Sequence, residues 1–126
     1  MRRLMPVLAL LISAPLVVFA ATTDLRIDHM AVGTAIDNRN LDGAATTFST
    51  GVPRLYCWMH VSGATPPVTL KHVWLLNGEK IAEVSLPIKY SEMRTWSSKM
   101  PQAGNWAVEA MDENGTVLSS TTFTVK

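Results

Sequence analysis

The sequence predicts an all-β fold, an antiparallel immunoglobulin-like β-sandwich of seven to eight strands. Apolar and polar residues alternate with a period of two over many short segments, as in half-buried strands. Clusters of Gly, Pro, Asn and Asp separate these segments at short intervals. After residue 21 we find no helical repeat of useful length. A small closed β-barrel is the alternative architecture for the same pattern.

The first two strands are predicted at residues 25–36 and 45–49. In the first, the alternation slips near His29 and Met30, which indicates a β-bulge. Asn, Asp and Gly residues between positions 37 and 43 then break the chain. The second strand is short, is centred on Phe48, and ends before Pro53.

Residues 54–61 form the strongest predicted strand, because its two faces differ clearly. One parity is wholly apolar and is expected to face the core, whereas the other is aromatic or amphipathic. The apolar set is Leu55, Cys57, Met59 and Val61, and the other set is Tyr56, Trp58 and His60.

The remaining strands are predicted at residues 68–76, 81–86, 94–98, 105–111 and 117–125. Asn77-Gly78 is the clearest hairpin signal, since both residues readily adopt the positive φ angles of a type I′ turn. Pro87 is expected to end the strand that follows this turn. Residues 112–115, Asp-Glu-Asn-Gly, predict a second hairpin turn before the last strand.

The first twenty residues are typical of a secretory signal peptide. Arg2-Arg3 precede an apolar run from Leu4 to Phe19, and the small residue Ala20 offers a cleavage site. An uncleaved membrane anchor is the alternative, although the run is short for a span of about 20 residues. We therefore expect residues 21–126 to form a single β-sandwich domain that is periplasmic or secreted.

The charge balance argues against nucleic-acid binding. Removing Arg2 and Arg3 from the 11 basic residues leaves nine, which face ten acidic residues. No run of like charges occurs, so the sequence lacks the basic face that a nucleic-acid binder needs.

Several short motifs occur in one order between about Val32 and Val125. They are Leu55-Tyr56-Cys57-Trp58, Val61-Ser62-Gly63, Lys71-His72-Val73-Trp74, Leu76-Asn77-Gly78, Arg94-Thr95-Trp96-Ser97-Ser98-Lys99, Gly104-Asn105-Trp106-Ala107-Val108-Glu109 and Asp112-Glu113-Asn114-Gly115. Together they resemble the bacterial domain of unknown function 2914. The resemblance implies an exported or membrane-linked β domain, and it brings no reaction, ligand or catalytic residue.

An enzymatic function is not predicted. The sequence contains no Gly-x-Ser-x-Gly elbow, His-Glu-x-x-His helix, phosphate-binding glycine loop or paired-cysteine motif. Its carboxylates are scattered singly. We expect a protein that is not an enzyme and needs no cofactor.

A metal site is a weaker hypothesis, built on Cys57, His72 and Met59. If residues 54–61 and 68–76 paired as a hairpin, Cys57 would lie nearly opposite His72, with Cβ atoms about 5 Å apart. Thiolate, imidazole and thioether would suit a soft copper ion. We favour the simpler interpretation, in which Cys57 is buried and unreactive and the histidine is bonded to a backbone carbonyl.

The tryptophans support a binding hypothesis. At least two of Trp58, Trp74 and Trp106 are expected in or around the core, whereas Trp96 has polar neighbours and is expected to be exposed. The predicted site for a ligand or partner consists of Trp96, Arg94, Lys99 and Tyr90.

The function predicted from sequence is therefore an exported, non-enzymatic binding or protein-interaction module of the cell envelope. Its partner would be an envelope protein or a glycan. A carbohydrate-binding domain that uses exposed tryptophans is one alternative, and a periplasmic copper-handling protein is another.

Overall fold

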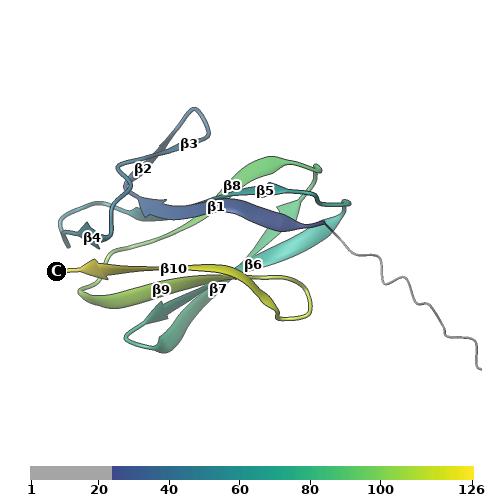
Figure 1. The fold of residues 1–126 in the computed structure, drawn as a ribbon. Helices are drawn as coiled ribbons and strands as arrows, with labels where there is room; N and C mark the ends of the chain where they lie inside the picture. Colours follow the sequence, from purple (N-terminus) through teal and green to yellow (C-terminus); the bar gives the residue numbers. More distant parts are fainter. Residues whose placement is uncertain (1–23) are drawn as a thin grey trace, which may run out of the picture.

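The computed structural model describes residues 24–126, so the predicted signal peptide lies outside the described residues. Two β-sheets face each other and a small hairpin stands on the outer side of one of them (Figure 1). Within residues 24–126 no helix long and apolar enough to span a membrane is found.

Ten strands make up the described chain. They are β1 (Arg26–Gly33), β2 (Ala35–Asp37), β3 (Asn40–Asp42), β4 (Thr47–Phe48), β5 (Leu55–Ser62), β6 (Val68–Leu76), β7 (Glu79–Ile88), β8 (Met93–Lys99), β9 (Gly104–Met111) and β10 (Val117–Val125).

One sheet has the order β1-β5-β8, and the other has the order β4-β10-β9-β6-β7. Neighbouring strands are antiparallel except for β4, which pairs in parallel with the end of β10. The two sheets stay separate and do not close on themselves. This confirms the predicted immunoglobulin-like β-sandwich rather than the small closed barrel.

The core fills the space between the two sheets. The apolar parity of β5 faces inward as predicted, with Leu55, Cys57, Met59 and Val61 fully buried. Aromatic rings occupy one end of the core, where the Trp106 ring stacks on Phe123 at 5.6 Å and meets Trp74 edge-on at 6.0 Å. Such aromatic pairs add about 0.5–1.5 kcal/mol beyond the area that they bury.

Of two expectations about the N-terminal strands, one is confirmed and one needs revision. The predicted β-bulge is present, with the register of β1 shifting between Ile27 and His29. However, the polar segment after residue 36 is not a simple break. It forms the hairpin β2–β3, whose turn residues Asn38 and Arg39 both have positive φ (51° and 65°).

The hairpin between residues 54–61 and 68–76, on which the metal hypothesis was conditional, does not form. Strand β5 pairs with β1 and β8, whereas β6 pairs with β7 and β9, so the two strands lie in opposite sheets. Each buries one parity in the core, and on β6 this parity includes His72 beside Leu70 and Trp74. In addition, Pro87 lies within β7 rather than after it. An edge strand tolerates proline because its outer side makes no ladder hydrogen bonds.

Gly33 allows the hairpin β2–β3 to approach the end of β1. A Cβ atom at this position would lie 2.5 Å from the backbone oxygen of Asp42 and 2.8 Å from the Leu41 side chain. Only glycine leaves room for this contact. The small residue therefore fixes the place where the hairpin leaves the sheet.

We expect Asn77→Pro to destabilise the domain much more than Asp112→Ala. Asn77 has a φ of 52° in the β6–β7 turn and its N–H donates to the Asn105 carbonyl. Proline cannot adopt the positive φ, and it has no N–H to donate in this hydrogen bond. Asp112 only caps its own turn, with Oδ1 accepting from the N–H groups of Asn114 and Thr116.

Urea unfolding of both variants would measure this difference. A loss of about 3 kcal/mol or more is expected for the proline variant and about 1 kcal/mol for the alanine variant. Equal unfolding midpoints would contradict the role assigned to the Asn77 turn.

Candidate functional site

The candidate site is a hollow of about 880 Å³ on the outer face of the three-stranded sheet, beneath the hairpin β2–β3. We call it the outer hollow. Figure 1 shows the hairpin on the side of this sheet that faces away from the five-stranded sheet. The residues that line the outer hollow are Arg39, Asn40, Trp58, His60, Tyr90, Glu92, Met93 and Arg94.

Strand register places the floor residues in two rows. His60 of β5 pairs with His29 of β1 on one side and with Arg94 of β8 on the other. Two residues along the strands, Trp58 pairs with Trp96. Because side chains alternate between faces, both rows project away from the core, opposite the buried residues Met59 and Ser97.

Trp58 holds the hairpin against the sheet. Its indole N–H donates to the backbone carbonyl of Arg39 at 2.9 Å, and its ring meets His29 edge-on at 5.6 Å. Only 8% of Trp58 is exposed, although it lies on the outer face. The hairpin therefore covers an aromatic residue that would otherwise face solvent.

Arg39 adopts a costly backbone conformation. A non-glycine residue in the left-handed region typically costs about 1 kcal/mol, and Gly or Asn is preferred at such turn positions. The Arg39 side chain contributes two compensating contacts. Its guanidinium carbon lies 5.4 Å from the centroid of the Trp96 ring, and Nη2 donates to the Arg94 carbonyl at 2.8 Å.

Arg94 is held from the hairpin side. Its Nη1 donates to Oδ1 of Asn40 at 2.6 Å. Hydrogen bonds thus run in both directions between the β2–β3 turn and β8, from Arg39 to the Arg94 backbone and from the Arg94 side chain to Asn40. Both guanidinium groups are therefore held in place at the outer hollow.

His60 bridges two carboxylates at the other end of the outer hollow. Its Nε2 lies 2.7 Å from Oε2 of Glu92, and its Nδ1 lies 3.6 Å from Oδ2 of Asp28. Ser62 Oγ donates to the same Asp28 oxygen, and Arg26 Nε lies 3.1 Å from Oδ1. The hydrogen bond from Ser62 and the nearby guanidinium hold the pKa of Asp28 below its usual range.

This cluster does not have the connectivity of a nucleophilic triad. In such a triad, histidine accepts the proton of the nucleophile, and the carboxylate orients the histidine. Here the carboxylate of Asp28 accepts the Ser62 proton, and both ring nitrogens of His60 face carboxylates. The Ser62 hydroxyl is therefore bonded to a carboxylate and not to the histidine.

The structure brings together three of the four residues predicted for binding. Tyr90, which is 66% exposed, and Arg94 line the outer hollow, and Trp96 lies beside them under Arg39. Trp96 is partly buried rather than exposed, because the Arg39 side chain covers its ring. Lys99 pairs with buried Leu55, so its strand parity is opposite to that of Arg94 and Trp96. It therefore does not join this group.

Six of the eight residues that line the outer hollow were not predicted as site residues; Trp58 was expected in or around the core, and Met93 was not singled out. Arg39, Asn40, His60 and Glu92 were missed. His60 was recognised as part of the outer parity of its strand, which was a usable signal. Arg39 and Asn40 carry no such signal in the sequence. Their segment has the composition of a chain break, and Arg39 lies 55 positions before its contact residue Arg94.

The residues of the metal hypothesis lie in the core. His72 Nε2 lies 3.3 Å from Sδ of Met59, and His72 Nδ1 contacts Ser97 Oγ. A thioether only accepts, so the ring proton is on Nε2 and the serine hydroxyl donates to Nδ1. Ser97 Oγ also accepts from the Trp74 indole N–H at 3.0 Å.

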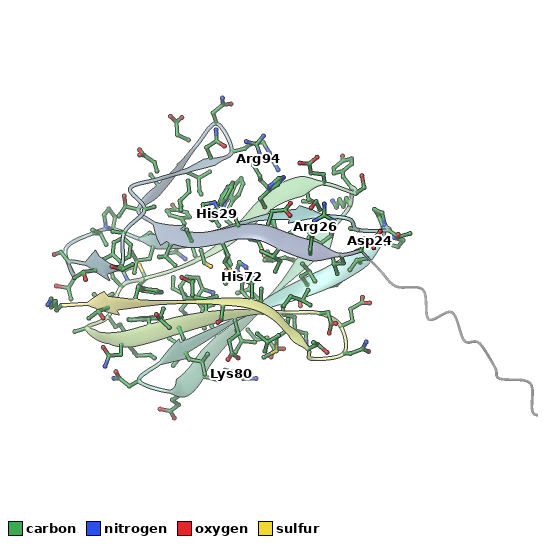
Figure 2. All side chains as sticks on the ribbon, viewed as in Figure 1. Asp24, Arg26, His29, His72, Lys80 and Arg94 are labelled. Atoms are coloured by element: carbon green, nitrogen blue, oxygen red, sulfur yellow. The ribbon has the colours of Figure 1, made fainter. Side chains whose placement is uncertain are left out.

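His72 is thus satisfied as a neutral core residue, with side-chain partners where a backbone carbonyl was expected. Figure 2 shows it between the two sheets. Burial lowers its pKa to about 4. Cys57 is fully buried in the aromatic end of the core, and burial raises the pKa of its thiol. Among residues 24–126, no group of three or more His, Cys, Asp or Glu side chains is arranged to hold a metal ion.

Comparison with known proteins gives a match to one family model and a shared fold. Residues 67–125 match the family model described as "Protein of unknown function (DUF2914)", which confirms the resemblance seen in the sequence. The CARDB domain of the PF1109 protein from Pyrococcus furiosus, crystallised in complex with di-metal ions, has a similar structure. The TM-score is 0.50 at 16% identity, covering 81% of this chain and 92% of that one.

At that identity the CARDB domain shows a shared fold and nothing about function. No curated protein matches this chain. The family match includes Tyr90, Glu92 and Arg94 but not Arg39, Asn40 or His60, so it covers only part of the outer hollow.

We expect Cys57 to react slowly with a thiol reagent in the native protein. The side chain is fully buried, and a thiol with a raised pKa is a poor nucleophile. Labelling with a chromogenic disulfide should speed up by orders of magnitude in unfolding concentrations of urea. Rapid labelling of the folded protein, or labelling that a chelator accelerates, would contradict burial as the cause.

We also expect stability to fall with decreasing pH between about 6.5 and 4 because of His72. The unfolded histidine titrates near pH 6.5 and the folded one near 4, so the unfolded chain binds more protons within this window. The contribution is complete above pH 6.5 and declines by at most about 1.4 kcal/mol per pH unit.

Urea unfolding at pH 7, 6 and 5 would measure this effect, with His72→Gln as the control. The variant should be less stable at pH 7, because it loses the imidazole contacts, but its stability should depend less on pH. Parallel pH profiles for the two proteins would show that His72 is not the group responsible.

Proposed function

We propose that this chain, a member of the DUF2914 family through residues 67–125, is a non-enzymatic binding module of the bacterial cell envelope. Its partner is a protein, and the outer hollow is where that partner docks. The proposed location rests on the signal-peptide pattern of the first twenty residues. The observation that carries the proposal is the outer hollow itself, which is already assembled from two distant segments of the chain.

The composition of the outer hollow fits a protein interface. Interface residues that dominate binding energy are enriched in Trp, Tyr and Arg and lie in well-packed pockets. Here Tyr90 is exposed at the site, while Trp96 and Trp58 are held beneath Arg39. Because hydrogen bonds already fix Arg39 and Arg94, a partner would lose little affinity to ordering them.

The two alternatives have less support. Stacking against a sugar ring requires an accessible indole face, whereas Trp58, Trp74 and Trp106 are buried and Arg39 covers Trp96. A copper site at Cys57, His72 and Met59 would lie in the closed core, where both ring nitrogens of His72 already have partners. Binding of a protein partner is therefore the function that we propose.

We expect Tyr90→Ala and Trp96→Ala to abolish capture of the partner from envelope extracts by the immobilised domain. Loss of a contact aromatic such as exposed Tyr90 typically weakens binding by about 2 kcal/mol or more. Trp96→Ala removes the ring on which the Arg39 guanidinium lies. Tyr90→Ala should leave the unfolding midpoint unchanged. Trp96→Ala should destabilise the fold much less than Trp58→Ala, which is expected to cost several kcal/mol as a buried aromatic.

Ile81→Ala is a matched control, because Ile81 is an exposed apolar residue on the edge strand of the other sheet. It should capture the same partner as the wild type. Capture by the Tyr90 and Trp96 variants at wild-type level would refute the outer hollow as the docking site. Unfolding of the domain by Trp96→Ala would place this tryptophan among the structural residues.

A further inference from the structure

We infer that the outer hollow recognises a carboxylate on its protein partner, and that Arg39 and Arg94 bind this group together. The inference rests on the proposed function and adds the chemistry of the ligand. It identifies the partner segment as acidic, with Asp or Glu side chains or a free C-terminus as the source of the carboxylate.

The first argument is the distribution of charge. Within residues 24–126, the ion pairs join Arg26 to Asp28, His60 to Asp28 and Glu92, and Lys71 and Lys80 to Glu83. Neither Arg39 nor Arg94 takes part in them. The groups that accept hydrogen bonds from the two guanidinium groups are neutral. Arg39 donates to the backbone carbonyl of Arg94, and Arg94 donates to Oδ1 of Asn40. Two guanidinium charges thus adjoin one hollow without a compensating carboxylate.

The acidic residue among those that line the outer hollow is already paired with a histidine. Glu92 also lines the outer hollow, but its Oε2 lies 2.7 Å from Nε2 of His60. His60 is in turn positioned by Asp28 on its other nitrogen. This chain of contacts holds the Glu92 carboxylate at the histidine, so the charge of the arginines is left for a ligand.

The second argument is the position of Arg39. Its φ of 65° belongs to a turn position where Gly or Asn would be free of strain. The backbone therefore gives no reason for an arginine there. The reason lies in the side chain, which reaches over Trp96 to Arg94 at the outer hollow. Local strain retained for the sake of a side chain is typical of functional sites.

The third argument is geometry. A guanidinium presents five N–H donors in a planar fork that matches a carboxylate. The hydrogen bonds to the Arg94 carbonyl and to Asn40 occupy Nη2 of Arg39 and Nη1 of Arg94. Further donors on both groups are available to a ligand. The site volume of about 880 Å³ accommodates several side chains, and exposed Tyr90 offers an apolar surface beside the charges.

The test is a titration of the protein with defined peptides, followed by tryptophan fluorescence, because Trp58 and Trp96 lie at the site. Hexaglutamate with acetylated and amidated ends tests side-chain carboxylates. Hexaalanine with a free C-terminus tests a terminal carboxylate, and capped hexaglutamine is the neutral control. Trigalacturonate tests a carboxylate carried by a glycan.

We expect at least one of the two carboxylate peptides to bind and hexaglutamine to bind at least tenfold more weakly. Arg39→Gln and Arg94→Gln should each weaken that binding at least tenfold, and raising the salt concentration should weaken it further. Lys80→Gln removes the same charge from the opposite side of the molecule, as Figure 2 shows, and should change binding less than twofold. Arg94→Lys keeps the charge but loses the fork, so it should restore binding only in part.

Several results would overturn the inference. These are no binding of either carboxylate peptide at millimolar concentration, equal binding of hexaglutamine, wild-type affinity in both glutamine variants, or binding of trigalacturonate alone. Thermal unfolding of each variant separates loss of binding from loss of fold.

Capture from envelope extracts distinguishes this inference from the proposed function. If the double variant Arg39→Gln, Arg94→Gln captured the partner normally while Tyr90→Ala did not, the docking site would stand and the carboxylate inference would fail. Loss of capture in the double variant, with Lys80→Gln unaffected, would support both.

Discussion

Both faces of β5 must be covered, and the arrangement of the molecule follows from this constraint. Its inward parity is apolar and packs against the five-stranded sheet. Its outward parity contains Trp58, a residue too large and apolar to leave in water without loss of stability. The hairpin β2–β3 provides the missing cover and satisfies the indole N–H through the Arg39 carbonyl. The outer hollow exists because this cover is a narrow hairpin and not a full layer.

The core contains polar groups that select one arrangement of the two sheets. His72 and Trp74 come from β6, whereas Met59 and Ser97 come from β5 and β8 of the facing sheet. Their hydrogen bonds form only when the sheets are correctly aligned, since a displaced strand would leave buried polar groups unsatisfied. We infer that this cluster contributes more to a unique packing than to stability. The same alignment fixes where β8 lies, and with it the position of Arg94 and Trp96.

The sequence was informative where the chain obeys a period of two over seven or more residues. Strands β6 and β10 were predicted with their observed bounds, and the Asn77-Gly78 turn was identified from its chemistry. The hairpin β2–β3 was missed because strands of three residues show too little alternation to recognise. The pairing of β5 was also missed. Two apolar strands joined by a short loop can form a hairpin or cross between sheets, and alternation is the same in both cases.

The candidate site was predicted in part for the same reason. Tyr90, Arg94 and Trp96 are close in sequence, so one short segment could suggest them together. Lys99 was grouped with them by proximity, although strand parity places it on the other face. The contributions of Arg39 and Asn40 depend on a long-range contact that no local pattern encodes. Prediction from a single sequence therefore located one wall of the outer hollow and missed the wall that faces it.

Pro87 gives the open edge of the five-stranded sheet a further property. As an imino acid within β7, it removes one backbone donor from a row that a foreign strand would need for pairing. Lys80 and Glu83 add charges along the same strand. This edge is consequently a poor template for intermolecular β-sheet extension, which lowers the risk of edge-to-edge aggregation at high concentration. It also limits recognition by strand addition there, so that contacts between side chains become the more favourable way for this sandwich to associate with another protein.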